Sequence, residues 1–376
     1  MQLDRRQWLA YLGIAVSGLG EPHLLGAEPA LRSTVAPDEP GLARLSLNEN
    51  PFGPAPEVLA AVQRETPNLC RYTGAEFDAL VTAISAKEKL PGEQIILGEI
   101  LGPLGTHLSL HGGAGGEFIY SDPGYTALID AAVAVGGRAV AVPLNAGLGN
   151  DLPALAARVN ERTRAMYLVN PHNPTGIVTE VDEFRSFVRG IARRALVIVD
   201  EAYLEFADHF AARTLTDLVR NGENVIVFRT FAKVYGLAGL EIGYGLVPRA
   251  IGQTLRAQGL NDPHLFNRLA VAAATASLKA QGYVERVRQQ VAVEREQWLR
   301  LFHELKLSHT PSSANFVFFE TGRPHATFSA ALLQAGVAIG RLFPPYDRWA
   351  RISIGLPREN ARARAAVRAV LQRAST

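Results

Sequence analysis

Polar side chains able to do covalent and acid–base chemistry follow three apolar runs of the chain, each at the point where a run ends. The runs cover residues 165–169, 195–199 and 225–228. The side chains that follow them are Asn173, Asp200, Tyr203 and Lys233. Each residue alone has an ordinary structural explanation: a turn for the asparagine, a helix cap for the aspartate, partial burial for the tyrosine and a surface position for the lysine. If the runs are parallel strands of one sheet, however, their carboxyl ends share an edge, where open α/β sheets bind ligands.

An amine, a carboxylate, a phenol and a carboxamide at one place suit the chemistry of pyridoxal phosphate (PLP). A lysine forms a Schiff base with the aldehyde of this cofactor, and it moves a proton once an amino acid has displaced it. A carboxylate keeps the pyridine nitrogen protonated, which makes the ring an electron sink. A tyrosine and an asparagine donate to the 3′ oxygen of the ring. The sequence therefore favours a PLP enzyme in which Lys233 is the reactive amine.

The elements that must position these residues alternate between short apolar runs and amphipathic segments. Further buried strands are expected at residues 94–97, 117–120 and 139–142, and helices at residues 152–160 and 181–193. The C-terminal third predicts helices at 263–281, 283–305 and from about residue 359, and strands at 315–319, 337–339 and 351–354. This order predicts an α/β fold with a mostly parallel central sheet flanked by helices, plus a smaller α+β domain.

Six motifs, met in the same order as in a known family, make the chain resemble the class I/II aminotransferases of PLP fold type I. Within that family it is most similar to the histidinol-phosphate aminotransferase-like branch. The motifs lie at residues 47–54, 170–176, 199–203, 229–239, 311–316 and 351–355. The first reads Leu-Asn-Glu-Asn-Pro-Phe-Gly-Pro and the second reads Asn-Pro-His-Asn-Pro-Thr-Gly. The resemblance spans residues 46–360, nearly the whole chain.

The resemblance implies a role for each matching residue at the cofactor. Lys233 carries the Schiff base and Asp200 pairs with the pyridinium nitrogen. Tyr203, the third catalytic residue, contacts the 3′ oxygen together with Asn173, and Tyr125 stacks on the ring. The remaining cofactor contacts are expected from Thr230, Gly98, Glu99 and Tyr72.

The same resemblance implies how the substrate is held and how subunits assemble. Arg351 takes the substrate carboxylate, for which its planar fork is suited. Other substrate contacts are expected from Arg341, Asn50 and Phe52. Tyr72 matches a tyrosine that reaches the cofactor phosphate of the neighbouring subunit, so a homodimer with shared active sites is expected.

The phosphate end of the cofactor site departs from the family pattern. The family reads Thr-Phe-Ser-Lys where this chain has Ala232 before Lys233, and Leu-Arg-x-Gly-Tyr where it has Glu241 in place of the arginine. A glutamate there removes an attraction to phosphate and adds a repulsion, each on the order of 3 kcal/mol at ~5 Å and an effective dielectric of ~20. The backbone amides after Gly98 and the hydroxyl of Thr230 remain as donors. We expect PLP to bind, but to be retained weakly.

Composition narrows the functional classes. The 376 residues carry 38 Lys and Arg against 36 Asp and Glu, a net charge of +2, which gives no sign of nucleic-acid binding. One cysteine, Cys70, excludes an internal disulfide. No apolar run reaches the ~20 residues of a membrane span. The glycine-rich residues 111–116 lack the spacing of a phosphate loop and predict a turn, and His107 and His111 lack a third ligand, so no metal site is expected.

The first residues differ in character from the rest. Arg5 and Arg6 precede a weakly apolar run over residues 8–20, and Ala27 ends a small-residue stretch that a signal peptidase would accept. This order resembles a twin-arginine export signal and predicts a periplasmic or otherwise exported protein; an ordinary N-terminal helix on a cytoplasmic protein is the alternative. The expected division is a signal at 1–27, an arm of the small domain at 28–58, a large PLP-binding domain at 59–269 and a small domain at 270–376.

The function expected from these residues is transfer of an amino group between an amino acid and a 2-oxo acid or related carbonyl. A PLP-dependent decarboxylase or lyase, or an amine oxidase, is possible on the same scaffold, because these reactions differ in which bond stands perpendicular to the ring. A non-catalytic PLP-binding relative is the weaker alternative, motivated by Ala232 and Glu241 and opposed by the intact Lys233, Asp200 and Tyr203.

Overall fold

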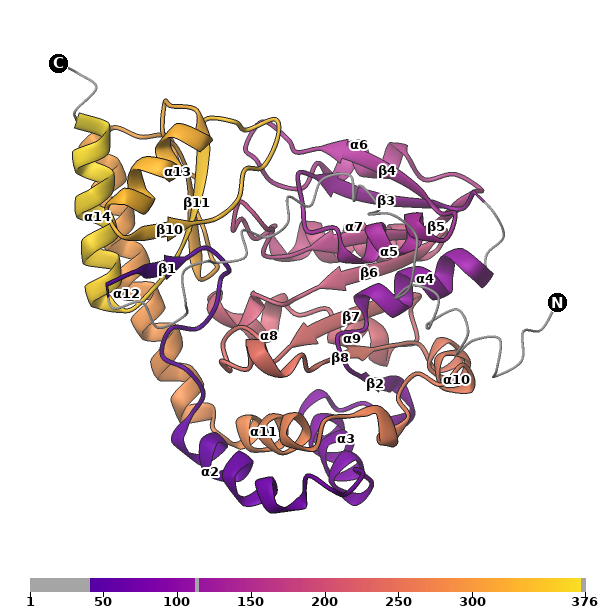
Figure 1. Ribbon diagram of the computed structural model, residues 1–376. Helices are drawn as coiled ribbons and strands as arrows, with labels where there is room; N and C mark the ends of the chain where they lie inside the picture. The colour runs from indigo at the N-terminus through magenta and orange to yellow at the C-terminus, as the bar shows by residue number, and fades with distance from the viewer. Residues whose placement is uncertain (1–40, 112–114, 373–376) are drawn as a thin grey trace, which may run out of the picture. The chain divides into compact units, whose positions relative to one another are not determined.

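The structure, a computed structural model, describes residues 41–111 and 115–372 (Figure 1). The export signal expected at residues 1–27 lies outside the described residues, as do most of the residues 28–40 of the expected arm and part of the glycine-rich segment 111–116. Over the described ranges, none of the helices combines the length and the apolar character that a membrane span needs.

A seven-stranded sheet forms the centre, with the strand order β2-β8-β7-β6-β5-β3-β4. Its strands are β2 (Ile95–Leu97), β3 (Glu117–Asp122), β4 (Arg138–Pro143), β5 (Thr163–Val169), β6 (Leu196–Asp200), β7 (Val225–Thr230) and β8 (Gly243–Leu246). All neighbouring pairs are parallel except those that β8 makes with β2 and β7. The predicted mostly parallel α/β sheet is confirmed.

Helices and short 3₁₀ turns connect the strands. The helices are α2 (Pro56–Glu65), α3 (Ala75–Glu88), α4 (Leu101–His111), α5 (Ala127–Ala134), α6 (Leu152–Ala157), α7 (Val181–Ala192), α8 (Phe210–Arg213), α9 (Thr216–Arg220), α10 (Arg249–Ala257), α11 (Arg268–Lys279), α12 (Gln281–Leu305), α13 (His325–Gln334) and α14 (Pro357–Gln372). The 3₁₀ turns are η1 (Thr66–Asn68), η2 (Gly92–Gln94), η3 (Leu204–Phe206), η4 (Ala238–Leu240) and η5 (Pro263–Leu265).

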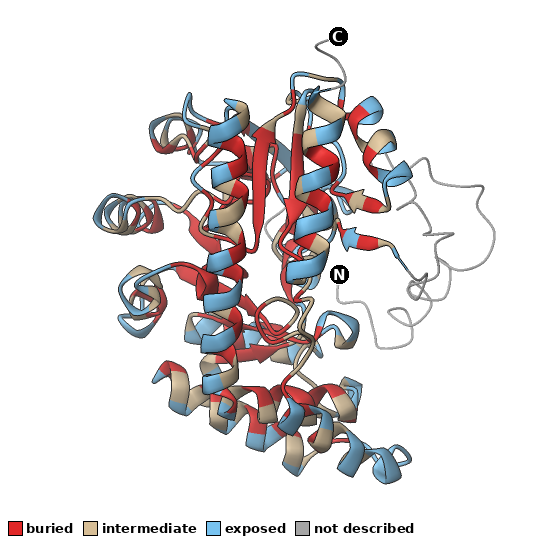
Figure 2. Cartoon of the chain, turned by 90° about the vertical axis from the view of Figure 1, so that its left-hand side faces the viewer, coloured by how far each residue is buried: buried red, intermediate tan, exposed pale blue. Residues whose placement is uncertain are grey.

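Both faces of the sheet are covered, because successive strand side chains point to opposite sides. On one face Val197 and Val199 belong to the same apolar cluster as Phe184 of α7, and on the other Ile198 clusters with Leu104 of α4. Strands β5, β6 and β7 are buried almost throughout, whereas the edge strand β4 is mostly exposed. Figure 2 shows buried strands at the centre and helices whose buried residues form a stripe on one side. The carboxyl ends of β5, β6 and β7 therefore emerge together from a rigid, dry core.

The smaller α+β part consists of two short ladders and three helices. Parallel strands β1 (Ala43–Leu45) and β10 (Val337–Ile339) form one ladder, and antiparallel strands β9 (Phe316–Glu320) and β11 (Trp349–Ser353) form the other. Helices α12, α13 and α14 pack against these strands. Strand β11 carries Arg351, so this part delivers the predicted substrate-binding arginine.

Two strands were missed by the sequence prediction, β1 and β8. Strand β8 contains Gly243 and Gly245, and glycine is uncommon inside strands. Close packing requires glycine at Gly243, where a Cβ would lie 2.7 Å from the Arg229 carbonyl oxygen, and a Cβ on Gly245 would displace the end of the Ile100 side chain. Absence of side chains here lets α4 and β7 approach β8.

The helix expected over residues 263–281 is broken. The structure has the turn η5 and then α11, because the Asn267 side chain accepts hydrogen bonds from the amides of Leu269 and Ala270 and so starts a new helix. The expected helix at 283–305 begins two residues earlier, at Gln281.

A buried charge network fixes the ends of β6 and β7 to each other. Arg229, at the end of β7, is 1% exposed. Its guanidinium contacts the carboxylate of Glu201, which follows β6, at 3.0 Å, and that of Glu88 on α3 at 3.0 Å. It also donates to the hydroxyls of Thr214 and Thr216. Burial alone would lower the pKa of Arg229, but the two carboxylates raise it well above its ordinary value, so the charge persists.

Replacement of Arg229 by Met should destabilise the protein strongly. It leaves Glu88 and Glu201 buried without a cationic partner, which costs about 3–5 kcal/mol. Urea unfolding measures the loss. The control Arg300→Met removes an exposed arginine whose Nε lies 3.6 Å from Glu296, and it should change the free energy of unfolding by less than about 0.5 kcal/mol. Equal effects of the two substitutions would contradict a central role for the network.

Candidate active site

Asp200 ends β6 as a buried acid without a cationic hydrogen-bonding partner among the described residues. Its carboxylate accepts hydrogen bonds from the Tyr167 hydroxyl at 2.7 Å and from the Ala202 amide at 3.0 Å. Burial raises the pKa of Asp200 to about 6, against the opposing effects of these two donors and of Lys233. Such an acid gains from a ligand that brings a protonated nitrogen, as the pyridinium of PLP does.

Lys233 lies close beyond the end of β7, three residues after Thr230. Its ammonium nitrogen is 5.7 Å from the centre of the Tyr203 ring, and within the described part of the chain it makes no ion pair. Its charge nevertheless lowers the pKa of both Asp200 and Glu99. Lys233 is half-buried, so the amine sits at the edge of the core and can be reached.

The Tyr203 hydroxyl is oriented by two asparagines. Asn173 donates to it from Nδ2 at 3.4 Å, and Asn48 donates at 3.2 Å. Each amide is held in that orientation from its other end: the Asn173 oxygen accepts from Arg351, and the Asn48 oxygen accepts from the Ser353 hydroxyl. Because both lone pairs of the Tyr203 oxygen are filled, its proton is left to donate to a ligand oxygen.

Arg351 is a buried guanidinium with no carboxylate partner among the described residues. It donates to the Asn173 Oδ1 at 2.6 Å and to the Ser46 carbonyl at 2.7 Å, while its Nε has no partner there. Its central carbon lies 5.0 Å from the centre of the Phe343 ring. Burial lowers the pKa of Arg351 to about 10. An unneutralised arginine in this position calls for an anionic ligand.

Tyr125 and Arg341 stand at the more open side of the site. Tyr125 is 46% exposed, and burial of the rest of its surface, with help from Asp200 and Glu99, raises its pKa to about 12. Tyr125 therefore stays neutral and offers a ring face to a ligand. Arg341 stacks on Phe343 with its central carbon 4.3 Å from the ring centre.

The residues at which the cofactor phosphate is expected are unlike those around the expected position of the ring. Glu99, two residues before α4, accepts a hydrogen bond on its carboxylate from the Thr230 hydroxyl at 2.6 Å. Burial raises the pKa of Glu99, and the charge of Glu241 adds to the rise. Gly98 has φ +111° and donates to the Gly243 carbonyl at 2.8 Å, which fixes the start of α4 against β8. Ala232 contributes no hydroxyl.

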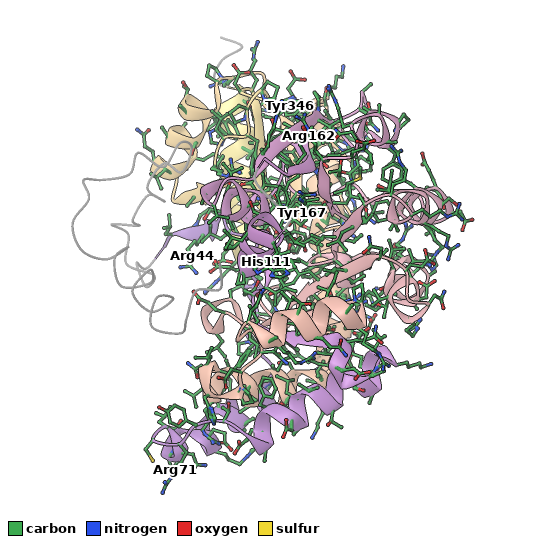
Figure 3. All side chains as sticks on the ribbon, turned by 90° about the vertical axis from the view of Figure 1, so that its right-hand side faces the viewer. Arg44, Arg71, His111, Arg162, Tyr167 and Tyr346 are labelled. Carbon is green, nitrogen blue, oxygen red and sulfur yellow. The ribbon has the colours of Figure 1, made fainter. Side chains whose placement is uncertain are left out.

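Three sequence-predicted residues have other contacts in the described chain. Tyr72 is 78% exposed, and its ring meets only the edge of His264 at 5.3 Å among aromatic neighbours. Figure 3 labels the adjacent Arg71 at the lower margin, away from the centrally placed Tyr167. Asn50 donates to the Val234 carbonyl at 2.9 Å, and the Phe52 carbonyl accepts from Tyr283 at 3.0 Å. The substrate roles of Asn50 and Phe52 stay predictions.

Two contributors to the site were missed, Asn48 and Tyr167. Asn48 has φ 56°, a conformation that asparagine tolerates. Its position inside the first motif is the one feature of the sequence that could have indicated a role in the site. Tyr167 is a buried residue in the middle of β5, where sequence alone indicates an ordinary hydrophobic core residue. Only the register of β5 with β6, which sets Tyr167 beside Ile198, puts its hydroxyl within reach of Asp200.

The histidine pair on α4 has a structural explanation. His107 and His111 stack with ring centres 4.5 Å apart, and both contact the Gln258 side chain. Within residues 41–111 and 115–372 no group of three or more His, Cys, Asp or Glu side chains is placed to hold a metal ion.

Substitution of Asp200 by Asn should stabilise the cofactor-free protein. The ordinary Asp pKa is 3.8 and the folded value is about 6, so the folded state holds a proton more tightly and loses stability as pH rises through this window. Two pKa units correspond to on the order of 3 kcal/mol, which Asp200→Asn regains at pH 7.5 and not below about pH 4. Urea unfolding across pH measures this, with the exposed Asp347→Asn as control. A gain independent of pH would contradict the argument.

Comparison with known proteins places the chain. The family described as aminotransferase class I and II matches residues 40–367. Histidinol-phosphate aminotransferase of Moorella thermoacetica is 34% identical over 338 residues, 87% of this chain and 85% of that protein. Histidinol-phosphate aminotransferase 2 of Ralstonia nicotianae is 36% identical over 343 residues, 89% and 90% of the two chains.

Among solved structures, histidinol-phosphate aminotransferase from Sinorhizobium meliloti in complex with pyridoxal-5′-phosphate matches with a TM-score of 0.80 at 32% identity, covering 89% of this chain and 92% of that one. The unpaired buried acid Asp200, the free amine of Lys233 and the oriented Tyr203 hydroxyl fit the ring of this cofactor. The chain therefore belongs to the class I and II aminotransferases, and it is a PLP-dependent aminotransferase of fold type I.

Proposed function

We propose that this enzyme moves an amino group from a donor that carries an anionic group close to its amine, and that Arg351 holds this group. The observation that supports the proposal is the buried Arg351 guanidinium, which lacks an acidic partner in the described chain and has its Nε unused. A Cβ on Gly340 would lie 3.1 Å from that nitrogen, so the absence of a side chain there leaves room beside the guanidinium. Phe316 and Phe343 keep the surroundings apolar, which strengthens the pairing with an anion.

PLP, when bound, supplies the electron sink that lets a hydrogen leave the carbon next to the amine. The protein's own groups do the rest. Asp200 holds a negative charge or a proton at the ring nitrogen, and Tyr203 donates its proton to the ring oxygen. Lys233 has a half-buried amine next to Tyr203, and it can take a proton from one atom of the substrate and return it to another.

Arg351 and Tyr203 are linked through a single side chain. Asn173 accepts from Arg351 at 2.6 Å and donates to Tyr203 at 3.4 Å. Binding of the substrate anion by Arg351 is therefore coupled, through Asn173, to the orientation of the Tyr203 hydroxyl. We infer that filling the Arg351 site sharpens the position of Tyr203.

The proposal predicts a clear donor preference. With 2-oxoglutarate as acceptor, a panel of amino acids, their decarboxylated amines and histidinol phosphate should show amino transfer from anionic donors. Histidinol phosphate is included because the relatives above carry that name. Donors that lack the anion should react at least about tenfold less well, because they forgo a charge-assisted pairing. Mass spectrometry of the keto product and of glutamate measures both halves of the reaction.

Two variants and two by-products complete this test. Arg351→Gln should shrink the difference between anionic and neutral donors, whereas Lys233→Ala should lower turnover with every donor by at least about 10³-fold. Release of carbon dioxide in place of glutamate would identify a decarboxylase, and peroxide would identify an oxidase. Equal rates for anionic and neutral donors would contradict the role of Arg351.

We further propose a homodimer in which Tyr72 of one subunit completes the site of the other. The Tyr72 segment is built rigidly: Arg268 donates to the carbonyls of Arg71 and Tyr72 and pairs with Glu65 and Glu76. Apolar side chains nevertheless face outward here: Leu69 of this segment is 59% exposed, and Leu265 is 76% exposed in the turn η5, whose His264 contacts Tyr72. An ordered loop with exposed aromatic and aliphatic tips suits an interface between copies.

Mixing two damaged variants should restore activity if the sites are shared. Tyr72→Ala removes the residue given to the partner, and Lys233→Ala removes one used within the subunit. Random reassociation makes about half of the dimers mixed, each with one intact site, so about a quarter of wild-type activity should return. Activity assays after unfolding and co-refolding measure it, with Leu110→Ala replacing Tyr72→Ala as the exposed control. No recovery above the sum of the parents would contradict shared sites.

A further inference from the structure

The Thr230 hydroxyl, which is expected to donate to the cofactor phosphate, already donates to a carboxylate of the protein. Glu99 accepts from Thr230 at 2.6 Å, and its charge interacts with that of Lys233. Thr230 has no other side-chain acceptor in the described residues, while its oxygen accepts from the Ala232 amide at 3.0 Å. The donor that a cofactor phosphate would use is therefore taken by the protein itself.

The titratable groups around Glu99 come from several elements. Glu241 stands before β8, Asp200 ends β6, Tyr125 follows β3, and Lys233 follows β7. Of the groups that shift the pKa of Glu99, Lys233 is the one cation. Among the described residues no arginine pairs with Glu99 or with Glu241 at salt-bridge distance. A phosphate dianion bound here would be repelled by the carboxylates of Glu99 and Glu241, and it would compete with them for the one ammonium group, that of Lys233.

Glu99 is held in place rather than free to swing. Gly98, just before it, is locked by its φ of +111° and by the hydrogen bond to the Gly243 carbonyl. A Cβ on Gly243 would lie 3.1 Å from the Glu99 Oε1, so the missing side chain at Gly243 makes the space in which this carboxylate lies. The backbone on both sides is thus shaped around the position of the Glu99 side chain.

We propose that Glu99 sets how strongly this enzyme prefers phosphorylated over unphosphorylated pyridoxal, by competing with the phosphate for Thr230 and opposing its charge. The inference rests on the cofactor assignment and on no particular substrate. Attachment to Lys233 and contacts with Asp200 and Tyr203 are common to both forms of the cofactor. The enzyme consequently discriminates little between PLP and pyridoxal, in spite of a helix N-terminus at this end of the site.

The test titrates the cofactor-free full chain with PLP and, in parallel, with pyridoxal. Bound cofactor is followed by its absorbance and by quenching of tryptophan fluorescence, so the readout is affinity. Glu99→Gln keeps an acceptor for Thr230 and removes the charge. It should tighten PLP at least about tenfold and leave pyridoxal within about twofold. Glu161→Gln, an exposed glutamate outside the site, should move neither affinity.

A second variant separates the two carboxylates. Glu241 is exposed, so its charge is screened, and Glu241→Gln should tighten PLP by less than Glu99→Gln does. Unchanged or weaker PLP binding in Glu99→Gln would overturn the inference, and so would a gain confined to Glu241→Gln. Failure of both aldehydes to bind the wild-type chain would overturn the cofactor assignment itself, which is a different result.

Discussion

The buried pairing of Arg229 with Glu201 and Glu88 is the constraint on which the geometry of the site depends. Glu201 is the residue after Asp200, and Arg229 precedes Thr230, which is three residues before Lys233. Acid and amine are therefore carried on two strand ends that are held together by charge as well as by the sheet. Removing water from this network makes each contact strong and each missing partner costly. A rigid, buried ion-pair network thus lies next to Asp200 and Lys233, the groups that must remain reactive.

Beyond this ion-pair network, the site contains charged groups that lack ion-pair partners in the described chain. Among the described residues neither Asp200 nor Arg351 has a salt-bridge partner, and burial disfavours the charged form of both, so each lowers the stability of the cofactor-free protein. In the proposed function, a protonated ring nitrogen would compensate Asp200 and an anionic substrate group would compensate Arg351. The ring end is complementary to its ligands for this reason. The phosphate end is the reverse, because Glu99 satisfies Thr230 internally and adds a charge of the same sign as the phosphate.

The strand-end residues could be predicted from sequence because they depend on one topological rule. Asn173, Asp200 and Lys233 each follow a recognisable apolar run, and β5, β6 and β7 proved to be parallel neighbours. Residues whose role depends on side-chain register were out of reach. Tyr167 looks like core, and the Glu99 carboxylate was not expected to contact Thr230, since motif reading considered only the backbone amides there. Strand β8 was hidden because it contains glycines, which are uncommon inside strands, and Gly243 is needed for close packing against β7.

Lys233 connects the two ends of the site electrostatically. Its charge lowers the pKa of both Asp200 and Glu99 and so stabilises their ionised forms. When the Lys233 amine is used to attach a ligand, both carboxylates feel the change. Asp200 is compensated by the protonated ring nitrogen, whereas Glu99 has only the Thr230 hydroxyl left. On this proposal, covalent attachment to Lys233 would have to offset a repulsion between the phosphate and Glu99. Retention of the cofactor would then depend on this lysine more than in a site that surrounds the phosphate with cationic groups.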